Sequence, residues 1–210
     1  MKVQIAKDLL AIRAVFLRPE EPFTWASGIK SPIYCDNRLT LSDITVRDHV
    51  EQALAQIIRE HYPQCEAVMG TSTAGIAHAA IVATILGLPM GYVRSGSKDH
   101  GRNNQIEGRC EPGTKVVVIE DLISTAGSCV DVVEALRSAG AEVLGIASIF
   151  TYGMTKADER LAQHQVKNVS ASDYDTLLQV AAEEGYISAQ QIPALLAFRA
   201  DPSDESWISR

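Results

Sequence analysis

The most restrictive feature of this sequence is a run of four consecutive apolar residues, Val116 to Ile119, followed directly by Glu120 and Asp121. Unbroken apolar runs of this length are typical of strands buried on both faces of a parallel sheet. Two adjacent carboxylates at the end of such a strand repel each other, so a purely structural design would avoid them. The segment therefore predicts a buried strand that ends at a ligand-binding site.

Strand and helix patterns alternate over the middle of the chain, which predicts an α/β fold with a mostly parallel sheet flanked by helices on both faces. The expected strands are 66–70, 89–94, 115–120 and 142–152, with helices at 74–87 and 127–140 and a further short strand at 165–171. Two closing helices are expected around Pro193.

The N-terminal part predicts other elements. Leu9 to Leu17 fit an amphipathic helix that ends near Pro19, and residues 23–38 predict a hairpin. A long helix follows, with Ser42 as its expected N-cap.

Composition limits the class of protein. The chain has 210 residues, 46% hydrophobic content and a net charge of −7, which fits a single soluble domain (1–210) and argues against nucleic-acid or membrane-surface binding. No apolar stretch is long enough to cross a bilayer, and the four cysteines lack zinc spacing. We therefore expect a cytoplasmic protein with reduced thiols.

Three loops follow the ends of predicted strands, where open sheets bind ligands: 70–75, 94–109 and 120–128. In the last, the hydroxyls of Ser124, Thr125 and Ser128 precede a helix N-terminus, an arrangement that suits a monophosphate. The adjacent acids would suit ribose hydroxyls, so a ribose 5-phosphate satisfies the whole motif. From this segment alone, an acidic strand end followed by a helix cap is equally well supported.

The loop 94–109 contains one aliphatic residue, Ile106, and is expected not to pack. Its basic residues favour a mobile lid over a polyanion rather than a solvated hairpin tip: Arg94, Lys98, His100 and Arg102. Thr71, Ser72 and Thr73 could form a second anion seat, although a capped helix is a strong alternative, and His78 is expected to be structural.

Near the N-terminus, Lys30, Tyr34 and Arg38 could hold a planar anion. The two cationic side chains would contact its negative charge, and the aromatic ring of Tyr34 would lie against its flat face. A surface hairpin with scattered charges is equally compatible with their spacing. The chain has neither GxxxxGK[ST] nor GxGxxG after a strand, which argues against a triphosphate P-loop and a dinucleotide fold.

Together these motifs resemble the bacterial, single-function orotate branch of the type I phosphoribosyltransferase family. "VVVIEDLISTAGS" is similar to the phosphoribosyl pyrophosphate (PRPP) motif of that family. "SGIKSPIYCDNR" and the pattern R-x-x-x-K-x-H-G from Arg94 to Gly101 narrow the resemblance to the orotate enzymes, and it extends over the whole chain in matching order.

The resemblance implies transfer of ribose 5-phosphate from PRPP to orotate with Mg²⁺, giving orotidine 5′-monophosphate and pyrophosphate in pyrimidine (UMP) biosynthesis. It also implies a small N-terminal hood (1–40 with C-terminal segments), a flexible catalytic lid and a homodimer that shares lid residues. The implied catalytic residues are Lys98, His100 and Asp121, and Mg²⁺ is expected to be held mainly by substrate. The implied PRPP-binding residues are Arg94, Lys98, His100, Glu120, Asp121, Leu122, Ile123, Ser124, Thr125, Ala126, Gly127 and Ser128, with Thr71, Ser72 and Thr73 as pyrophosphate loop. The implied orotate-binding residues are Ser124, Lys30, Tyr34 and Arg38.

Two departures from the family pattern affect the base site. Ala74 stands where some relatives have a lysine, and "TYGMTK" stands where some have an arginine for orotate. Arg38 could supply that charge instead. The alternatives are a phosphoribosyltransferase for another base and a PRPP-sensing regulator; the orotate-type segment argues against the first, and Lys98 and His100 argue against the second.

Overall fold

The computed structural model describes residues 1–25, 28–94 and 105–209 and is built around a six-stranded sheet in the order β10-β9-β8-β5-β6-β7. The strands are β5 (Ala67–Thr71), β6 (Met90–Val93), β7 (Ile106–Glu107), β8 (Lys115–Ile123), β9 (Glu142–Thr151) and β10 (Asn168–Asp173). Neighbouring strands are parallel except for the antiparallel pair β6–β7. The predicted α/β class with a mostly parallel sheet is confirmed.

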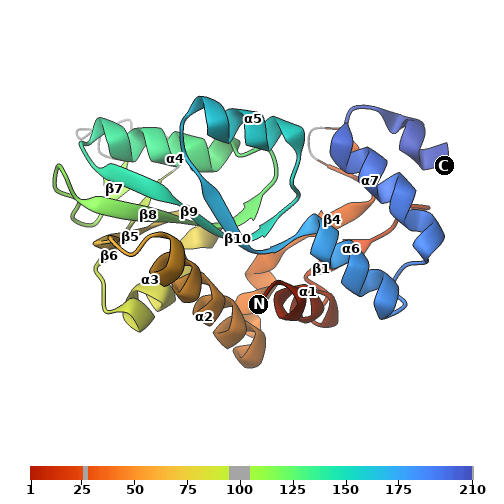
Figure 1. Ribbon diagram of the computed structural model, residues 1–210, viewed down its shortest axis with the longest axis horizontal. Helices are drawn as coiled ribbons and strands as arrows, with labels where there is room; N and C mark the ends of the chain where they lie inside the picture. Colours follow the sequence, from red (N-terminus) through yellow and green to blue (C-terminus); the bar gives the residue numbers. More distant parts are fainter. Residues whose placement is uncertain (26–27, 95–104, 210) are drawn as a thin grey trace.

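Helices cover both faces of the sheet, as predicted (Figure 1). On one face lie α2 (Ile44–His61) and α3 (Ala74–Leu86), and on the other lie α4 (Gly127–Ser138) and α5 (Thr155–Gln163). Successive side chains of β8 pack on alternate faces of the sheet: Val117 and Ile119 belong to one apolar cluster, whereas Val116 and Val118 belong to the other. This two-sided burial explains why the apolar run of β8 does not alternate with polar residues.

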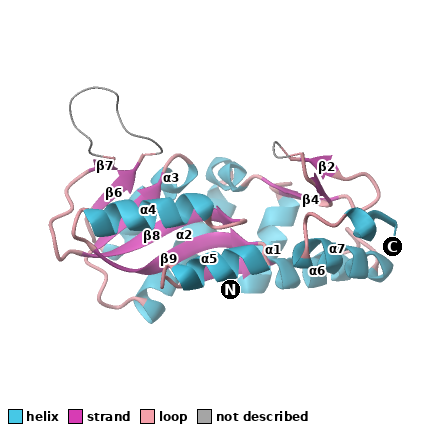
Figure 2. Cartoon of the chain, turned by 90° about the horizontal axis from the view of Figure 1, so that it is seen from above, coloured by secondary structure: helices cyan, strands magenta, loops and turns pink. Residues whose placement is uncertain are grey.

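A smaller group of elements lies at one end of the sheet (Figure 2). It comprises β1 (Val15–Leu17), which pairs with β4 (Ile33–Cys35), the hairpin of β2 (Phe23–Thr24) and β3 (Lys30–Ser31), the helices α6 (Tyr174–Glu183) and α7 (Ile192–Ala200), and the 3₁₀ helices η1 (Asn37–Ser42), η2 (Ala189–Gln191) and η3 (Glu205–Ser209). The hairpin predicted over 23–38 is therefore shorter than expected, because β4 pairs with β1 instead. The ring of Trp25 stacks on Tyr152 and meets the edge of Phe198, which joins the hairpin to β9 and α7.

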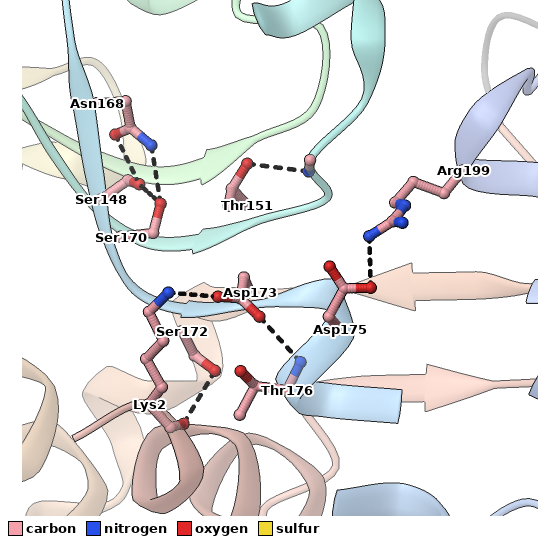
Figure 3. Close-up of polar contacts among 11 residues, drawn as sticks. Lys2, Ser148, Thr151, Asn168, Ser170, Ser172, Asp173, Asp175, Thr176 and Arg199 are labelled. Carbon is pink, nitrogen blue, oxygen red and sulfur yellow. Dashed lines mark hydrogen bonds and ion pairs between the residues drawn. The ribbon is translucent and has the colours of Figure 1, made fainter. Parts of the chain in front are cut away.

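The last strand binds the start of the chain (Figure 3). Lys2 of α1 (Lys2–Ala11) places its Nζ 2.6 Å from Oδ2 of Asp173, and Ser172 Oγ donates to the Lys2 carbonyl at 3.0 Å. Oδ1 of Asp173 accepts the N–H of Thr176 at 2.9 Å and so caps α6. Residues from opposite ends of the sequence therefore form one packed unit.

Two predictions for the N-terminal part are wrong. The first helix ends at Ala11, because Arg13 takes a left-handed φ of 57° and the chain turns, so that Phe16 pairs with Tyr34 in an antiparallel ladder. The N-cap of α2 is Asp43, whose Oδ1 accepts the N–H of Val46 at 3.0 Å, whereas Ser42 belongs to η1.

Two further predictions are corrected near the predicted site. Ile106 does pack: it lies in β7, is 7% exposed and joins the cluster beneath α4. The strand that carries Glu120 and Asp121 does not end at them but continues to Ile123, which pairs with Thr151 of β9. In the part of the chain that the structure describes, no helix combines the length and apolar character needed to span a membrane.

Candidate active site

Glu120 lies on β8 near the carboxyl end of the strand, and it is almost completely buried, with 4% of its surface exposed. Its Oε1 accepts hydrogen bonds from Thr71 Oγ1 at 2.7 Å and from the N–H of Asp121 at 3.0 Å, and Ser128 Oγ donates to Oε2 at 3.3 Å. Burial, followed by the neighbouring carboxyl of Asp121, raises the pKa of Glu120 to about 8. Ionisation of Glu120 is therefore unfavourable in the free protein.

Asp121 is half-buried, and its backbone is fixed by a residue that the sequence analysis did not single out. Asn37, 1% exposed at the start of η1, donates its Nδ2–H to the carbonyl of Asp121 at 2.7 Å. The partner is a backbone carbonyl 84 positions away in the chain, so no local pattern could reveal the contact. It attaches the segment after β4 to the end of β8.

The loop after β8 leads into α4 through Ala126, which takes a left-handed φ of 59° and is the N-cap without a side-chain cap bond. The first N–H groups of a helix have no partner within the helix and carry partial positive charge. Among the described residues, the hydroxyls of Ser124 and Thr125 also have no hydrogen-bond partner. These N–H groups and two hydroxyls are available to an anion, whereas the hydroxyl of Ser128, the third predicted donor, already donates to Glu120.

The loop after β5 lies against β8. The Thr71 hydroxyl donates to Oε1 of Glu120 and contacts the Ile119 carbonyl. Ser72 donates its N–H to the carbonyl of Val93 at 3.1 Å, and Thr73 is exposed. A Cβ on Gly75 would lie 2.4 Å from the Ile119 carbonyl oxygen, so only glycine lets α3 begin this close to β8. The Thr71 side chain is therefore engaged within the protein, and the loop presents Thr73 and its own backbone outward.

A cavity of about 710 Å³ lies between the loop after β5, the hairpin of β6 and β7, and α4. Thr71, Ser72, Arg94, Gln105 and Ser128 contribute to its wall. Nη1 of Arg94 lies 3.2 Å from Oε1 of Glu107. The predicted lid residues Lys98 and His100 lie outside the described residues.

The candidate base-binding residues lie on the N-terminal strands and on η1. Lys30 Nζ donates to Thr24 Oγ1 at 2.9 Å, and Tyr34 is 41% exposed with its ring 5.6 Å from Phe23. Both carboxylate oxygens of Asp36 accept hydrogen bonds from Arg38, at 2.6 and 2.8 Å, and this pairing raises the pKa of Arg38 above its usual range. The Arg38 side chain is 65% exposed and already has a partner.

Two predicted contact residues belong to the strand rather than to the loop. Leu122 packs in part against the core, and Ile123 is 1% exposed among the residues beneath α4. Their side chains are engaged in the sheet, so their contribution to a ligand would come from the backbone. Among the described residues, no group of three or more His, Cys, Asp or Glu side chains could hold a metal ion.

Known proteins are similar to this chain over its entire length. Residues 43–181 match the phosphoribosyl transferase domain. A protein of Bacillus cytotoxicus named orotate phosphoribosyltransferase is 57% identical over 209 residues, which cover 100% of both chains. The chain belongs to the orotate phosphoribosyltransferase family.

Solved structures in and near this family have the same fold. The orotate phosphoribosyltransferase from Aeropyrum pernix is 33% identical, with a TM-score of 0.76 over 88% of this chain and 99% of that one. The Leishmania donovani UMP synthase is 27% identical, with a TM-score of 0.78 over 93% of this chain but 41% of that chain. The chain thus corresponds to the full length of the first structure and to one part of the second.

Proposed function

We propose that this protein transfers the 5-phosphoribosyl group of PRPP to orotate, releasing pyrophosphate and forming orotidine 5′-monophosphate for pyrimidine synthesis. The observation that carries the proposal is the arrangement at the end of β8, in which two adjacent carboxyl groups are followed by the loop that leads into the uncapped N-terminus of α4. The full-length similarity to proteins named orotate phosphoribosyltransferase supports the choice of base.

In this proposal the end of β8 binds the ribose 5-phosphate. Glu120 and Asp121 accept the ribose hydroxyls, and the loop from Thr125 to Ser128 donates to the 5′-phosphate, helped by the partial positive charge of α4. Breaking the anomeric bond develops positive charge on the ribose. Two fixed carboxylates nearby stabilise that charge more in the transition state than in the bound substrate.

The leaving pyrophosphate needs cationic groups. Arg94, the loop from Thr71 to Thr73 and the lid residues Lys98 and His100 are the proposed contacts. The donor set fits Mg²⁺ held mainly by substrate, because the described residues of the site offer two neighbouring carboxylates, and Mg²⁺ commonly keeps substrate phosphates and waters as ligands. When bound, Mg²⁺ would supply charge neutralisation on the diphosphate.

Orotate is proposed to lie between Ser124 and the N-terminal residues Lys30, Tyr34 and Arg38. Because Asp36 already pairs with the Arg38 guanidinium, binding of the orotate carboxylate there would require a shared or exchanged partner. Residues 1–40 and the C-terminal helices are proposed to form a hood over the base, within one domain.

We also propose a homodimer that works in the cytoplasm and shares lid residues between subunits. Three large apolar residues between β4 and the start of α2 are exposed: Tyr34 by 41%, Leu39 by 42% and Ile44 by 75%. A second copy that covered them would remove apolar surface from water. Light scattering that gave the mass of a monomer at micromolar concentration would contradict the dimer.

The deciding experiment is an absorbance assay with purified protein, PRPP, Mg²⁺ and orotate, with uracil and the purine bases as parallel substrates. We expect loss of the orotate signal alone. Activity on another base would contradict orotate as the substrate but would leave the proposed binding of the ribose 5-phosphate group in place. Tight PRPP binding with no turnover on any base would instead indicate a regulator.

A further inference from the structure

One arginine lies against the proposed phosphate loop although nothing in the sequence singled it out. Arg160 belongs to α5, between the buried Ala157 and Leu161, and its Nη1 donates to the carbonyl of Thr125 at 2.9 Å. A Cβ on Gly127 would come within 2.9 Å of the same Nη1. The guanidinium therefore lies directly against the backbone that leads into α4.

The charge of Arg160 is not neutralised by a close acid. Among residues 1–25, 28–94 and 105–209, no carboxylate oxygen forms an ion pair with its guanidinium. Its influence reaches the first turn of α4: burial chiefly raises the pKa of the Cys129 thiol to about 12, and Arg160 acts in the opposite direction. A full positive charge behind the loop is larger than the partial charge of a helix terminus.

The conformation of the loop also requires a stabilising contact such as the hydrogen bond from Arg160. Ala126 is held in the left-handed region, which is unfavourable for a residue with a side chain, and α4 has no side-chain N-cap. The bond from Arg160 fixes the Thr125 carbonyl toward α5. A carbonyl held there cannot turn its negative end toward a bound anion.

We infer that Arg160 is a positioning residue for the 5′-phosphate: it holds the loop in its anion-accepting conformation and supplies positive charge behind it. The inference rests on the proposed function, because it takes the phosphate of PRPP as the ligand of the loop. It assigns a contribution to substrate affinity to a helix that the sequence motif does not include.

The test compares Arg160→Met and Arg160→Lys with a matched control, Arg137→Met. Arg137 donates Nη1 to the His164 carbonyl at 2.6 Å and Nη2 to the Gln165 carbonyl at 3.2 Å, so it also connects α4 to the α5 region, but at the far end. A purely structural role predicts the same result for both methionine variants.

We expect Arg160→Met to raise the KM for PRPP about 10-fold, the usual effect of losing a hydrogen bond to a charged group, with kcat and the KM for orotate changed less than about 3-fold. Arg160→Lys should recover part of the loss, since it keeps the charge. Arg137→Met should leave both KM values unchanged. An unchanged KM for PRPP in Arg160→Met, or equal changes in both methionine variants, would overturn the inference.

Calorimetric titration with ribose 5-phosphate separates this inference from the proposed function. Arg160→Met should bind ribose 5-phosphate about 10-fold more weakly than the unmodified protein and Arg137→Met. If the unmodified protein does not convert orotate, the proposed function fails, but this titration still tests Arg160. Equal affinity of all three proteins for ribose 5-phosphate would contradict the role of Arg160 alone.

Discussion

Two glutamates of this protein are almost completely buried, yet their surroundings are opposite in kind. Glu51, 1% exposed on α2, places Oε1 2.6 Å from Nδ1 of His78, which is 0% exposed on α3. Glu120, 4% exposed on β8, is bonded to hydroxyls and a backbone N–H and stands next to a second carboxyl group. Burial is the largest cause of a raised pKa in both.

The comparison of Glu51 with Glu120 shows that burial by itself does not identify a functional group. Glu51 pairs with an imidazole inside the core, and the hydrogen bond with His78 and the charge of Arg47 oppose the effect of burial on the pKa of Glu51. Asp121 adds to the effect of burial at Glu120 instead of opposing it. A buried carboxyl beside a like charge is unfavourable until a ligand supplies donors, which is a property of a binding site.

The largest expected difference between Glu120 and Glu51 is in the effect of their substitution on catalysis. Glu120→Gln should lower kcat/KM for PRPP about 10²-fold, because an acceptor that faces the developing positive charge loses its own charge. Glu51→Gln should stay within about 2-fold of the unmodified protein. Steady-state kinetics on both variants decides the matter, and equal losses in the two would mean that the effect comes from burial rather than from the site.

A second prediction concerns the stability of the core pair. His78→Ala should lower the free energy of unfolding by about 3 kcal/mol, because it leaves Glu51 buried without its partner. The residual kcat/KM of the folded variant should be unchanged. Urea unfolding followed by circular dichroism measures the first quantity; a loss below about 1 kcal/mol would show that the pair is not a structural requirement.

The third prediction uses the raised pKa of Glu120. A carboxyl whose pKa is about 8 when folded and 4.5 when unfolded binds its proton more tightly in the folded state, so stability falls as the pH rises from 4.5 toward 8. The part due to Glu120 should be about 2 kcal/mol between pH 5.5 and 7.5. Urea unfolding should show this decline in the unmodified protein and less of it in Glu120→Gln. Parallel curves for the two proteins would contradict the assignment.

The smallest expected effect is a proton released on substrate binding. Ribose hydroxyls and Mg²⁺ both favour the ionised carboxylate, so binding of PRPP should lower the pKa of Glu120 and release about half a proton or more at pH 7. Calorimetry in buffers of different ionisation enthalpy measures the number. Glu51→Gln should release as many protons as the unmodified protein and Glu120→Gln fewer; a buffer-independent heat in the unmodified protein would exclude the coupling.

Some local expectations failed where a distant partner competed with the local pattern. Phe16 has the spacing of the first helix, yet it forms a strand because Tyr34 supplies a ladder partner. Ile106 is isolated in a polar segment, yet it is buried because β6 offers an edge for β7. Asp43 and Ser42 are both good N-caps, and the choice between them depended on where η1 ended.

The sequence by itself determined the class of fold, the order of its central strands and helices, and the acidic and hydroxyl residues that meet after Ile119, because apolar periodicity and strand-end chemistry are local properties of the chain. Only the tertiary structure decided that Glu120 is buried and bonded to Thr71, that Asn37 fixes the backbone of Asp121, and that Arg160 lies behind the loop. Each of these contacts joins side chains to groups far away in the sequence, often to a backbone carbonyl that has no residue identity. Their strength and their effect on charge depend on packing distances that exist only once the helices lie on the sheet.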